Sequence, residues 1–286
     1  DLKEVGLGVL HDTDGQQATA IVQFDNLEAR SVVPIQDFHV IDDFEQGRKF
    51  TTPWGAAGQP EWDYVGGEFN VRLANANSWT SFFYWPDGVY ELAEGQPVEF
   101  RLDVVSAYSS DVYVQLGAFF ANEGDDRGYS TGMHLNNNKV FLDKAYGGAT
   151  SFFFDQTVTA NSNPKTISLT LTREGDSMRV GVKVVLRDDP QQVLFVREVI
   201  DHPGADAMVS GQDPGPPPLG PVTAVFWNCG TWIANAEVVV DNLECSEDPS
   251  PVLLGIRPQN LSAATLAWPG TNVPLESDSI QGPCLP

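Results

Sequence analysis

Apolar and polar side chains alternate along most of this chain, which is the period of a β-strand with one buried face. We find no window of about 12 residues with apolar residues at helical spacing. Strands are therefore predicted over residues 37–45, 68–74, 79–85, 97–107, 111–121, 138–143, 151–155, 165–173, 178–187, 192–200, 222–228 and 236–244. Because Gly, Asn and Pro separate these short strands, the pattern predicts an all-β jelly-roll sandwich.

One phrase of this pattern occurs twice. Ala236–Glu244 reads AEVVVDNLE, and Ala20–Glu28 reads AIVQFDNLE, at an offset of 236 − 20 = 216 residues. At the same offset, Val9–Asp12 aligns with Val225–Asn228. We interpret each copy as a strand, a turn and a second strand, so that the chain begins with the closing hairpin of a domain and later supplies a whole domain.

Two isolated strands are marginally stable in water, so this N-terminal hairpin needs a sheet to join. Three interpretations remain open: it packs on its own domain, it enters the sheet edge of a neighbouring copy, or it is the remnant of a tandem array. Pairing with a neighbour makes a head-to-tail contact that gives a ring or a filament. The apolar residues that such assembly would bury are Val9, Ile21, Val22 and Phe24.

Composition narrows the possible partners. The chain has 286 residues with 39 acidic and 16 basic side chains and a net charge of −23. This charge argues against nucleic-acid or anionic-membrane partners, and it attracts cations such as Ca²⁺. No apolar run reaches the roughly 20 residues of a membrane helix. Few lysines, many turn residues and the single sequon at Asn260 favour an extracellular protein.

The C-terminal part is expected to be too small to fold without contacts to the rest of the molecule or to a neighbour. We predict an N-terminal extension over residues 1–36, the sandwich over 37–245, and a linker with a short β-rich tail over 246–286. A tail of this length is too small to hold its own core, so it should dock on the sandwich or on a neighbour. The three cysteines lack the spacing of a zinc site. Three pairings are possible, and we favour a disulfide between Cys245 and Cys284.

Several phrases carry a family resemblance. Ile41–Glu45 and Val240–Glu244 open and close the predicted domain in a way that resembles the jelly roll of concanavalin-like lectins and many carbohydrate-binding modules. The middle of the chain is similar to repeat modules of large secreted bacterial proteins, through Arg127–Ser130, Leu169–Arg173 and Val193–Val199. The resemblance implies the fold, and those modules have no agreed activity.

Three groups of residues could carry chemistry. Glu61, Asp63 and Glu68 are similar to the carboxylates of laminarinase-like glycoside hydrolases, but an unbroken strand turns Glu68 to the opposite face, and a turn at Gly66-Gly67 is expected. Sugar rings stack on flat aromatic side chains, so exposed aromatics could form a glycan platform. Its candidate residues are Trp62, Trp79, Phe82 and Tyr84. We also expect Trp79, Phe83 and Trp85 to face the core.

The third group concerns calcium. Jelly-roll carbohydrate modules often hold a structural Ca²⁺ between their first and last strands, and the resemblance places its ligands at Asp43 or Glu45 together with Asp241. Hard oxygen ligands suit this cation, while a carboxylate pair that caps strand ends explains the same residues.

The function that the sequence favours is a non-catalytic extracellular subunit that assembles with copies of itself through the N-terminal hairpin or the C-terminal tail. The alternative is a glycan-binding module of a secreted polysaccharide-processing protein, and a glycoside hydrolase is the third choice.

Overall fold

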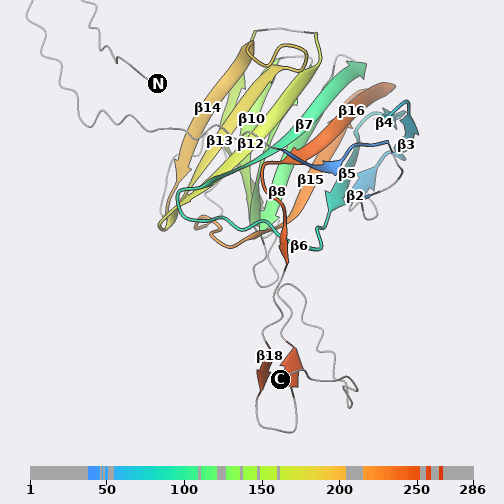
Figure 1. Ribbon diagram of the computed structural model, residues 1–286. Helices are drawn as coiled ribbons and strands as arrows, with labels where there is room; N and C mark the ends of the chain where they lie inside the picture. The colour runs from blue at the N-terminus through green and yellow to red at the C-terminus, as the bar shows by residue number, and fades with distance from the viewer. Residues whose placement is uncertain are drawn as a thin grey trace, which may run out of the picture. The chain divides into compact units, whose positions relative to one another are not determined.

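The computed structural model of the protein describes residues 38–45, 47, 49–50, 55–108, 111–120, 127–135, 138–146, 149–159, 162–203, 215–251, 256–258 and 264–266. Every structural statement below concerns these residues. They form β-strands and connections, and two antiparallel sheets contain most of the strands (Figure 1).

Sheet A has eight strands, seven of them in the order β14-β13-β12-β7-β16-β4-β3. The eighth strand, β1, pairs with the C-terminal residues 243–245 of β16, beyond the part that pairs with β4. Their bounds are β1 His39–Asp42, β3 Glu61–Val65, β4 Glu68–Leu73, β7 Pro97–Tyr108, β12 Lys165–Glu174, β13 Ser177–Leu186, β14 Val193–Asp201 and β16 Ala236–Cys245. The pairing of β12 with β13 is long and regular. It runs without a register shift from Lys165, opposite Leu186, to Glu174, opposite Ser177.

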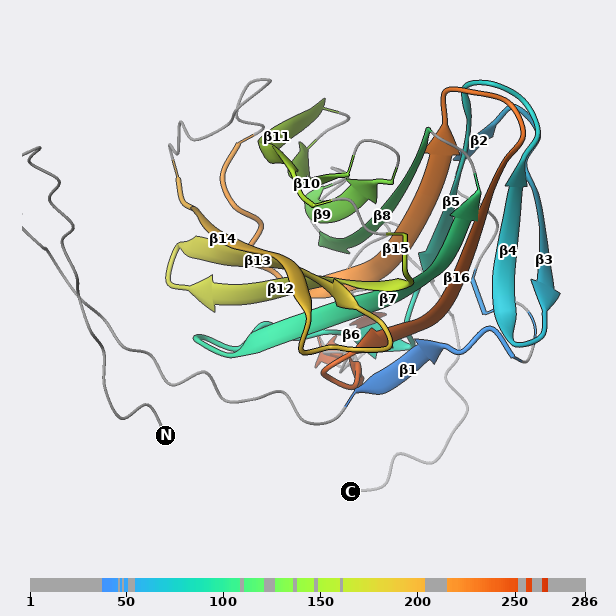
Figure 2. The same ribbon diagram turned by 90° about the horizontal axis from the view of Figure 1, so that it is seen from above.

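Sheet B has seven strands in the order β11-β10-β9-β8-β15-β5-β2. Their bounds are β2 Gly55–Ala57, β5 Ser78–Tyr84, β8 Val112–Phe120, β9 Arg127–His134, β10 Lys139–Tyr146, β11 Ala149–Thr157 and β15 Val222–Thr231. Figure 2 shows the two sheets stacked and curved, with the outer face of sheet B on the concave side.

Two small pairs lie outside these sheets. β17 (Ser250–Pro251) pairs with β6 (Gly88–Val89), and β18 (Ile256–Pro258) pairs with β19 (Ala264–Leu266). In the part of the chain described, no helix has the length and apolar character needed to cross a membrane.

The core lies between the inner faces of the two sheets. Alternation puts Leu169 and Leu171 of β12 beside Val182 and Val180 of β13, and all four side chains are at most 1% exposed. From sheet B, Trp227 stacks on Phe82 at 4.5 Å between ring centroids. Burial of such side chains is the main force that stabilises the sandwich.

These observations confirm the predicted all-β jelly-roll sandwich. The alternating pattern also located most of the strands. It missed β9, in which Gly128, Gly132 and small polar residues replace the alternation. It also missed β3 as a ladder strand, although residues 61–65 pair with β4.

The prediction of a closing hairpin is wrong for the copy that the structure describes. β15 pairs with β5 and β8 of sheet B, whereas β16 pairs with β4, β7 and β1 of sheet A. The two strands therefore lie in facing sheets, because alternation fixes which side of a strand is buried and not which sheet the strand joins. The first copy, with Val9, Ile21, Val22 and Phe24, lies outside the described residues, and its role in assembly stays a prediction.

Candidate functional site

The aromatic strand β5 faces the opposite way from our prediction. Phe82 and Tyr84 are 0% and 4% exposed and point into the core. Trp79 and Trp85 lie on the outer side and are 38% and 55% exposed. The prediction failed because we assigned the face with two tryptophans to the core, while the outer face of sheet B is itself lined with aromatic rings.

A first aromatic cluster lies on this outer face and consists of Phe83 of β5, Phe226 of β15 and Phe119 of β8. Phe83 is stacked on Phe226 at 5.1 Å and on Phe119 at 5.6 Å, with small angles between the ring planes. Trp85 extends the cluster, since its ring is stacked on Phe83 at 6.2 Å. The first cluster therefore consists of three stacked phenylalanine rings and, at one end, the exposed indole of Trp85.

A second aromatic cluster lies toward the other end of the same strands and consists of Tyr113, His134, Phe141 and Trp232. Trp232, which follows β15, stacks on His134 at 5.4 Å and contacts Tyr113 at 5.4 Å. Phe141 of β10 lies on the other side of His134 at 5.2 Å. Trp232 is 49% exposed, so this cluster also presents an indole to solvent.

Glycines make room for both clusters. A Cβ added to Gly117 would meet the ring of Phe226 at 2.3 Å, and one added to Gly230 would meet the ring of Tyr113 at 2.5 Å. A Cβ at Gly128 would meet the Phe119 ring at 2.7 Å and one at Gly132 would meet the Phe141 ring at 2.8 Å, although backbone carbonyls lie nearer, at 2.4 and 2.2 Å. Each ring therefore lies on the backbone of a neighbouring strand, which is possible only where that strand has no side chain.

A polar row separates the two clusters and consists of Asn228, Gln115, Ser130 and Asp143, from four adjacent strands. The Asn228 amide donates to Gln115 Oε1 at 2.8 Å, and Gln115 Nε2 donates to Asp143 Oδ2 at 2.9 Å. The Ser130 hydroxyl also donates to Asp143 Oδ1. Asn228 Oδ1 is buried and has no hydrogen-bond partner in the described part of the chain.

Asp143 is the titrating member of this row. Its side chain is 4% exposed, and burial raises the pKa of its carboxyl to about 7, while the hydrogen bonds from Ser130 and Gln115 oppose this shift. The row therefore contains a carboxyl that changes protonation near neutral pH.

The arrangement suits an extended ligand. Along β8 the outer positions are Tyr113, Gln115, Gly117 and Phe119, which give an aromatic ring at each end and an amide between them. Six residues of strand separate the two rings, which is roughly 20 Å at 3.3 Å per residue. The face offers ring stacking at both ends and hydrogen bonds in the middle.

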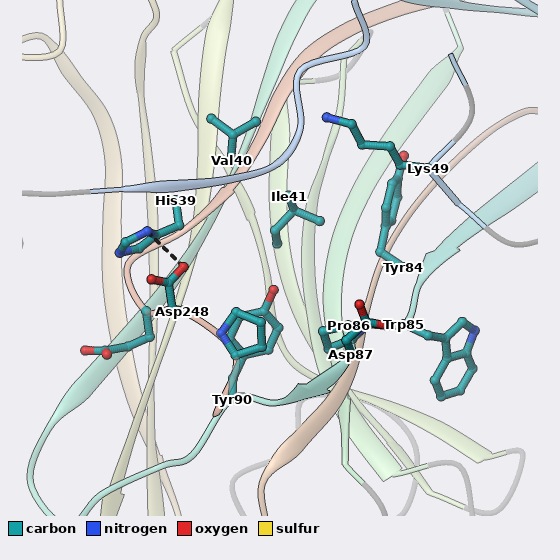
Figure 3. A pocket seen from close by; sticks show the side chains of 12 residues that line it. His39, Val40, Ile41, Lys49, Tyr84, Trp85, Pro86, Asp87, Tyr90 and Asp248 are labelled. Atoms are coloured by element: carbon teal, nitrogen blue, oxygen red, sulfur yellow. Dashed lines mark ion pairs between the residues drawn. The ribbon is translucent and has the colours of Figure 1, made fainter. Parts of the chain in front are cut away.

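A separate cavity of about 270 Å³ lies between β1, the β5–β6 connection and residues 247–249 (Figure 3). Two of its charged side chains already have partners: His39 Nδ1 lies 2.9 Å from Asp248 Oδ1, and Lys49 Nζ lies 2.9 Å from Asp43 Oδ1. Figure 3 shows the ring of Trp85 turned away from these groups. Trp85 nevertheless lines this cavity, so the cavity adjoins the exposed end of the first cluster. Among the described residues that line it, no polar network is comparable to the Asp143 row.

The structure divides the glycan-binding residues that the sequence indicated. Only Trp79 lies on the outer face of sheet B. Phe82 and Tyr84 are core residues, so no sugar ring can stack on them. Trp62 is half-buried on β3 and packs edge-on against Phe82 at 5.7 Å.

The three carboxylates of the hydrolase-like phrase lie on the β3–β4 hairpin. Gly66 and Gly67 form its turn, as expected, with φ of 66° and 85°. Since this turn pairs Val65 with Glu68, Glu68 shares the face of Glu61 and Asp63, whereas an unbroken strand would have turned it to the opposite face. Asp63 forms an ion pair with Arg72 at 2.8 Å. Glu61 and Glu68 stand four strand positions apart, roughly 13 Å, far from the 5–5.5 Å that a retaining glycosidase needs.

Two of the three predicted calcium ligands have cationic partners. Asp43 is paired with Lys49, and Asp241 Oδ2 is paired with Arg187 at 2.6 Å. Glu45 is exposed and donates its backbone N–H to Asp43. Within the described ranges, no group of three or more His, Cys, Asp or Glu side chains is arranged to hold a metal ion. The calcium site stays a prediction.

The cysteines give no support for the predicted disulfide. Cys245 and Cys229 are free, buried thiols. Burial raises the pKa of both thiols, to about 12 for Cys245. The predicted partner of Cys245, Cys284, lies outside the described residues.

Comparisons with known proteins bear on the fold. No family model matches the chain, and no curated protein matches it. Among solved structures, it is similar to the CBM2 module of the evolved Dit of Lactobacillus casei BL23 phage J-1 (TM-score 0.48, 11% identity, covering 74% of this chain and 98% of that one). It is also similar to the potassium-bound carbohydrate recognition domain of Emp46p (0.46, 10%, 72% and 95%) and to a Bacillus licheniformis β-glucanase (0.37, 10%, 74% and 92%). With its two stacked antiparallel sheets, the chain has a jelly-roll β-sandwich fold.

Proposed function

We propose that this protein is a non-catalytic glycan-binding module and that the outer face of sheet B holds a polysaccharide chain. The observation that supports this most is the position of its tryptophans. Of the five that the structure describes, three are exposed, namely Trp79, Trp85 and Trp232, and all three belong to the strands of sheet B or directly follow them. Exposed indoles gathered on one concave face are the usual means of stacking sugar rings.

The polar row supports the same function. Sugar hydroxyls both donate and accept hydrogen bonds, and the row offers an amide acceptor at Asn228 Oδ1 that has no partner among the described residues. This oxygen has almost no accessible surface, so a ligand hydroxyl would reach it only after the half-buried Asn228 side chain turns outward. The new hydrogen bond would then satisfy a polar atom whose lack of a partner costs free energy. Stacking at the two clusters with hydrogen bonding between them favours an oligosaccharide over a single sugar.

The charge of this face favours a neutral glycan. Asp143 is the buried carboxyl of the row, and Lys139 is neutralised by Asp155 at 2.7 Å. The whole chain carries −23, so a polyanionic glycan would be repelled. We place such a module in a secreted polysaccharide-processing protein, which agrees with the extracellular location expected from composition. Self-assembly through the N-terminal repeat stays an alternative, since its residues lie outside the described ranges.

Isothermal titration calorimetry against a panel of soluble neutral polysaccharides, β-glucans among them, tests the proposal. We expect binding heat for the parent protein and a loss of it in the double variant Trp85→Ala/Trp232→Ala. The matched control is Val196→Ala, because Val196 is 70% exposed on sheet A and its removal should leave binding unchanged. If no glycan binds, or if the double variant binds as the parent does, the proposal is wrong.

A further inference from the structure

A lysine and an aspartate lie in contact inside the sandwich. Lys144 of β10 in sheet B and Asp201 at the end of β14 in sheet A are each 1% exposed, and Nζ lies 2.8 Å from Asp201 Oδ2. Tyr129, also 1% exposed, is the register partner of Lys144 on β9 and donates its hydroxyl to the same Oδ2 atom. The lysine also donates to the carbonyl of Gly215. The contact therefore joins the two sheets.

Burial makes the charged state of this pair costly. Two ions removed from water lose hydration that a single contact between them does not always replace. The surroundings are aromatic, since Tyr129 contacts Phe120 at 6.0 Å and Phe153 at 6.4 Å. Conversion of the pair to a neutral product would remove both buried charges at once.

The two groups are also held in a reactive arrangement. Well-oriented groups in contact react as if at very high concentration, because their translational and rotational freedom is already lost. Lys144 is fixed by Asp201 and by the Gly215 carbonyl, and the carboxylate is fixed by Lys144 and Tyr129. A hydroxyl that donates to Oδ2 would assist the departure of this oxygen, because it offsets the negative charge that builds up on Oδ2 as the Cγ–Oδ2 bond breaks.

We propose that Lys144 and Asp201 condense into an intramolecular isopeptide bond. The lysine ammonium first passes a proton to Oδ2 along their hydrogen bond, which leaves a neutral amine and a neutral carboxyl. Nζ then forms a bond to Cγ, and the Cγ–Oδ2 bond breaks. Two of the three ammonium protons leave with Oδ2 as one water molecule, and the third remains on the amide nitrogen. No oxidant or co-reactant is required.

This bond would act as a covalent staple between the sheets. It would link β10 to β14, which are separated along the chain by β11, β12 and β13. A cross-link of this kind restricts the unfolded chain, as a disulfide does. Tyr129 would be a catalytic residue of this reaction, since its hydroxyl contacts the oxygen that leaves.

Intact mass measured under denaturing conditions tests the proposal on the parent protein. We expect a mass lower than that of the sequence by one water molecule, and a branched proteolytic fragment that joins the segments of Lys144 and Asp201. An unmodified mass after prolonged incubation of the folded protein would overturn the proposal and leave a buried ion pair in its place.

The chain offers a matched control for this chemistry. Lys139 and Asp155 lie 2.7 Å apart but are 36% and 38% exposed, so their segments should never appear in a branched fragment. Tyr129→Phe keeps the ring and removes the hydroxyl, and we expect it to slow formation of the bond by roughly a hundredfold. A rate equal to that of the parent would exclude the assigned role of Tyr129. Asp201→Ala should give the full sequence mass.

Discussion

The outer faces of the two sheets are built differently. Sheet A presents ion pairs between side chains, such as Arg179 with Glu174 at 2.9 Å and Arg72 with Asp63 at 2.8 Å. Sheet B presents stacked aromatic rings, amides and a buried carboxyl. Charged pairs of the first kind are typical of a face that meets only water.

This difference indicates which of the two outer faces binds a ligand. Rings that rest on glycines are of little use to a solvated surface. An amide oxygen without a hydrogen-bond partner among the described residues occurs on both faces, at Asn228 of sheet B and Asn70 of sheet A, so the rings make the distinction. Sheet B keeps these rings on its concave side (Figure 2). The following predictions test whether this difference between the faces is real.

The largest effect is expected from Asp143→Asn. Because burial raises the pKa of Asp143 to about 7, the folded protein binds a proton more tightly than the unfolded chain. The stabilisation that Asp143 contributes to the parent, relative to the Asn variant, should therefore be complete below about pH 4 and be lost as the pH rises to about 7, by roughly 2–4 kcal/mol. Chemical denaturation of both proteins at several pH values measures it, and a difference in stability between them that does not change over this range contradicts the assignment.

Gly117→Ala should come next. The new Cβ would meet the Phe226 ring at 2.3 Å and Ser130 Cβ at 2.8 Å, so the first cluster must shift. We expect a loss of about 1–3 kcal/mol in the free energy of unfolding.

Gly181→Ala is the matched control on sheet A, where the nearest atom is Thr170 Cβ at 3.4 Å. This contact is ordinary, so the change should be neutral or stabilise by up to about 1 kcal/mol. Equal losses at the two glycines would remove the distinction between the faces.

A smaller effect is expected from Trp232→Ala. Removal of a stacking partner should weaken glycan binding by about 0.5–1.5 kcal/mol, which is a few-fold to roughly tenfold in Kd. The melting temperature should change little, because the indole is half exposed. Calorimetry and thermal melts separate the two readouts, and a variant that melts early but binds normally would assign Trp232 a structural role.

The smallest effect is expected from Arg179→Ala on sheet A. Its ion pairs with Glu174 and Glu198 lie near the surface, so the loss should stay within about 1 kcal/mol and shrink as salt is added. Glycan binding should not change. A large, salt-independent loss would show that this face contributes more than a solvated surface does.

The sequence could predict what depends on neighbours along the chain. Alternation identified the long strands β7, β12 and β13 and the all-β class, because the buried face of a strand shows in residues that are close together in the sequence. The turn at Gly66-Gly67 was also expected, since two adjacent glycines suit positive φ.

The rest depends on contacts between distant segments. No local pattern shows that β15 and β16 join different sheets, or that Gly117 must accommodate the ring of Phe226 from a strand more than a hundred residues later. Asp143 was missed because nothing near it in the sequence marks its burial, and its partners Gln115 and Ser130 come from β8 and β9. The alternation of Tyr113, Gln115, Gly117 and Phe119 was the one available signal of this face.

An NMR titration that follows the indole N–H signals of the tryptophans tests the central claim most directly. On addition of a neutral oligosaccharide, we predict shifts for Trp85 and Trp232 on the outer face of sheet B. The signals of Trp227, which is fully buried, and of Trp62 against Phe82 should not move. Shifts confined to Trp62, or a ligand that binds without moving Trp85 and Trp232, would contradict the assignment of the glycan site to this face.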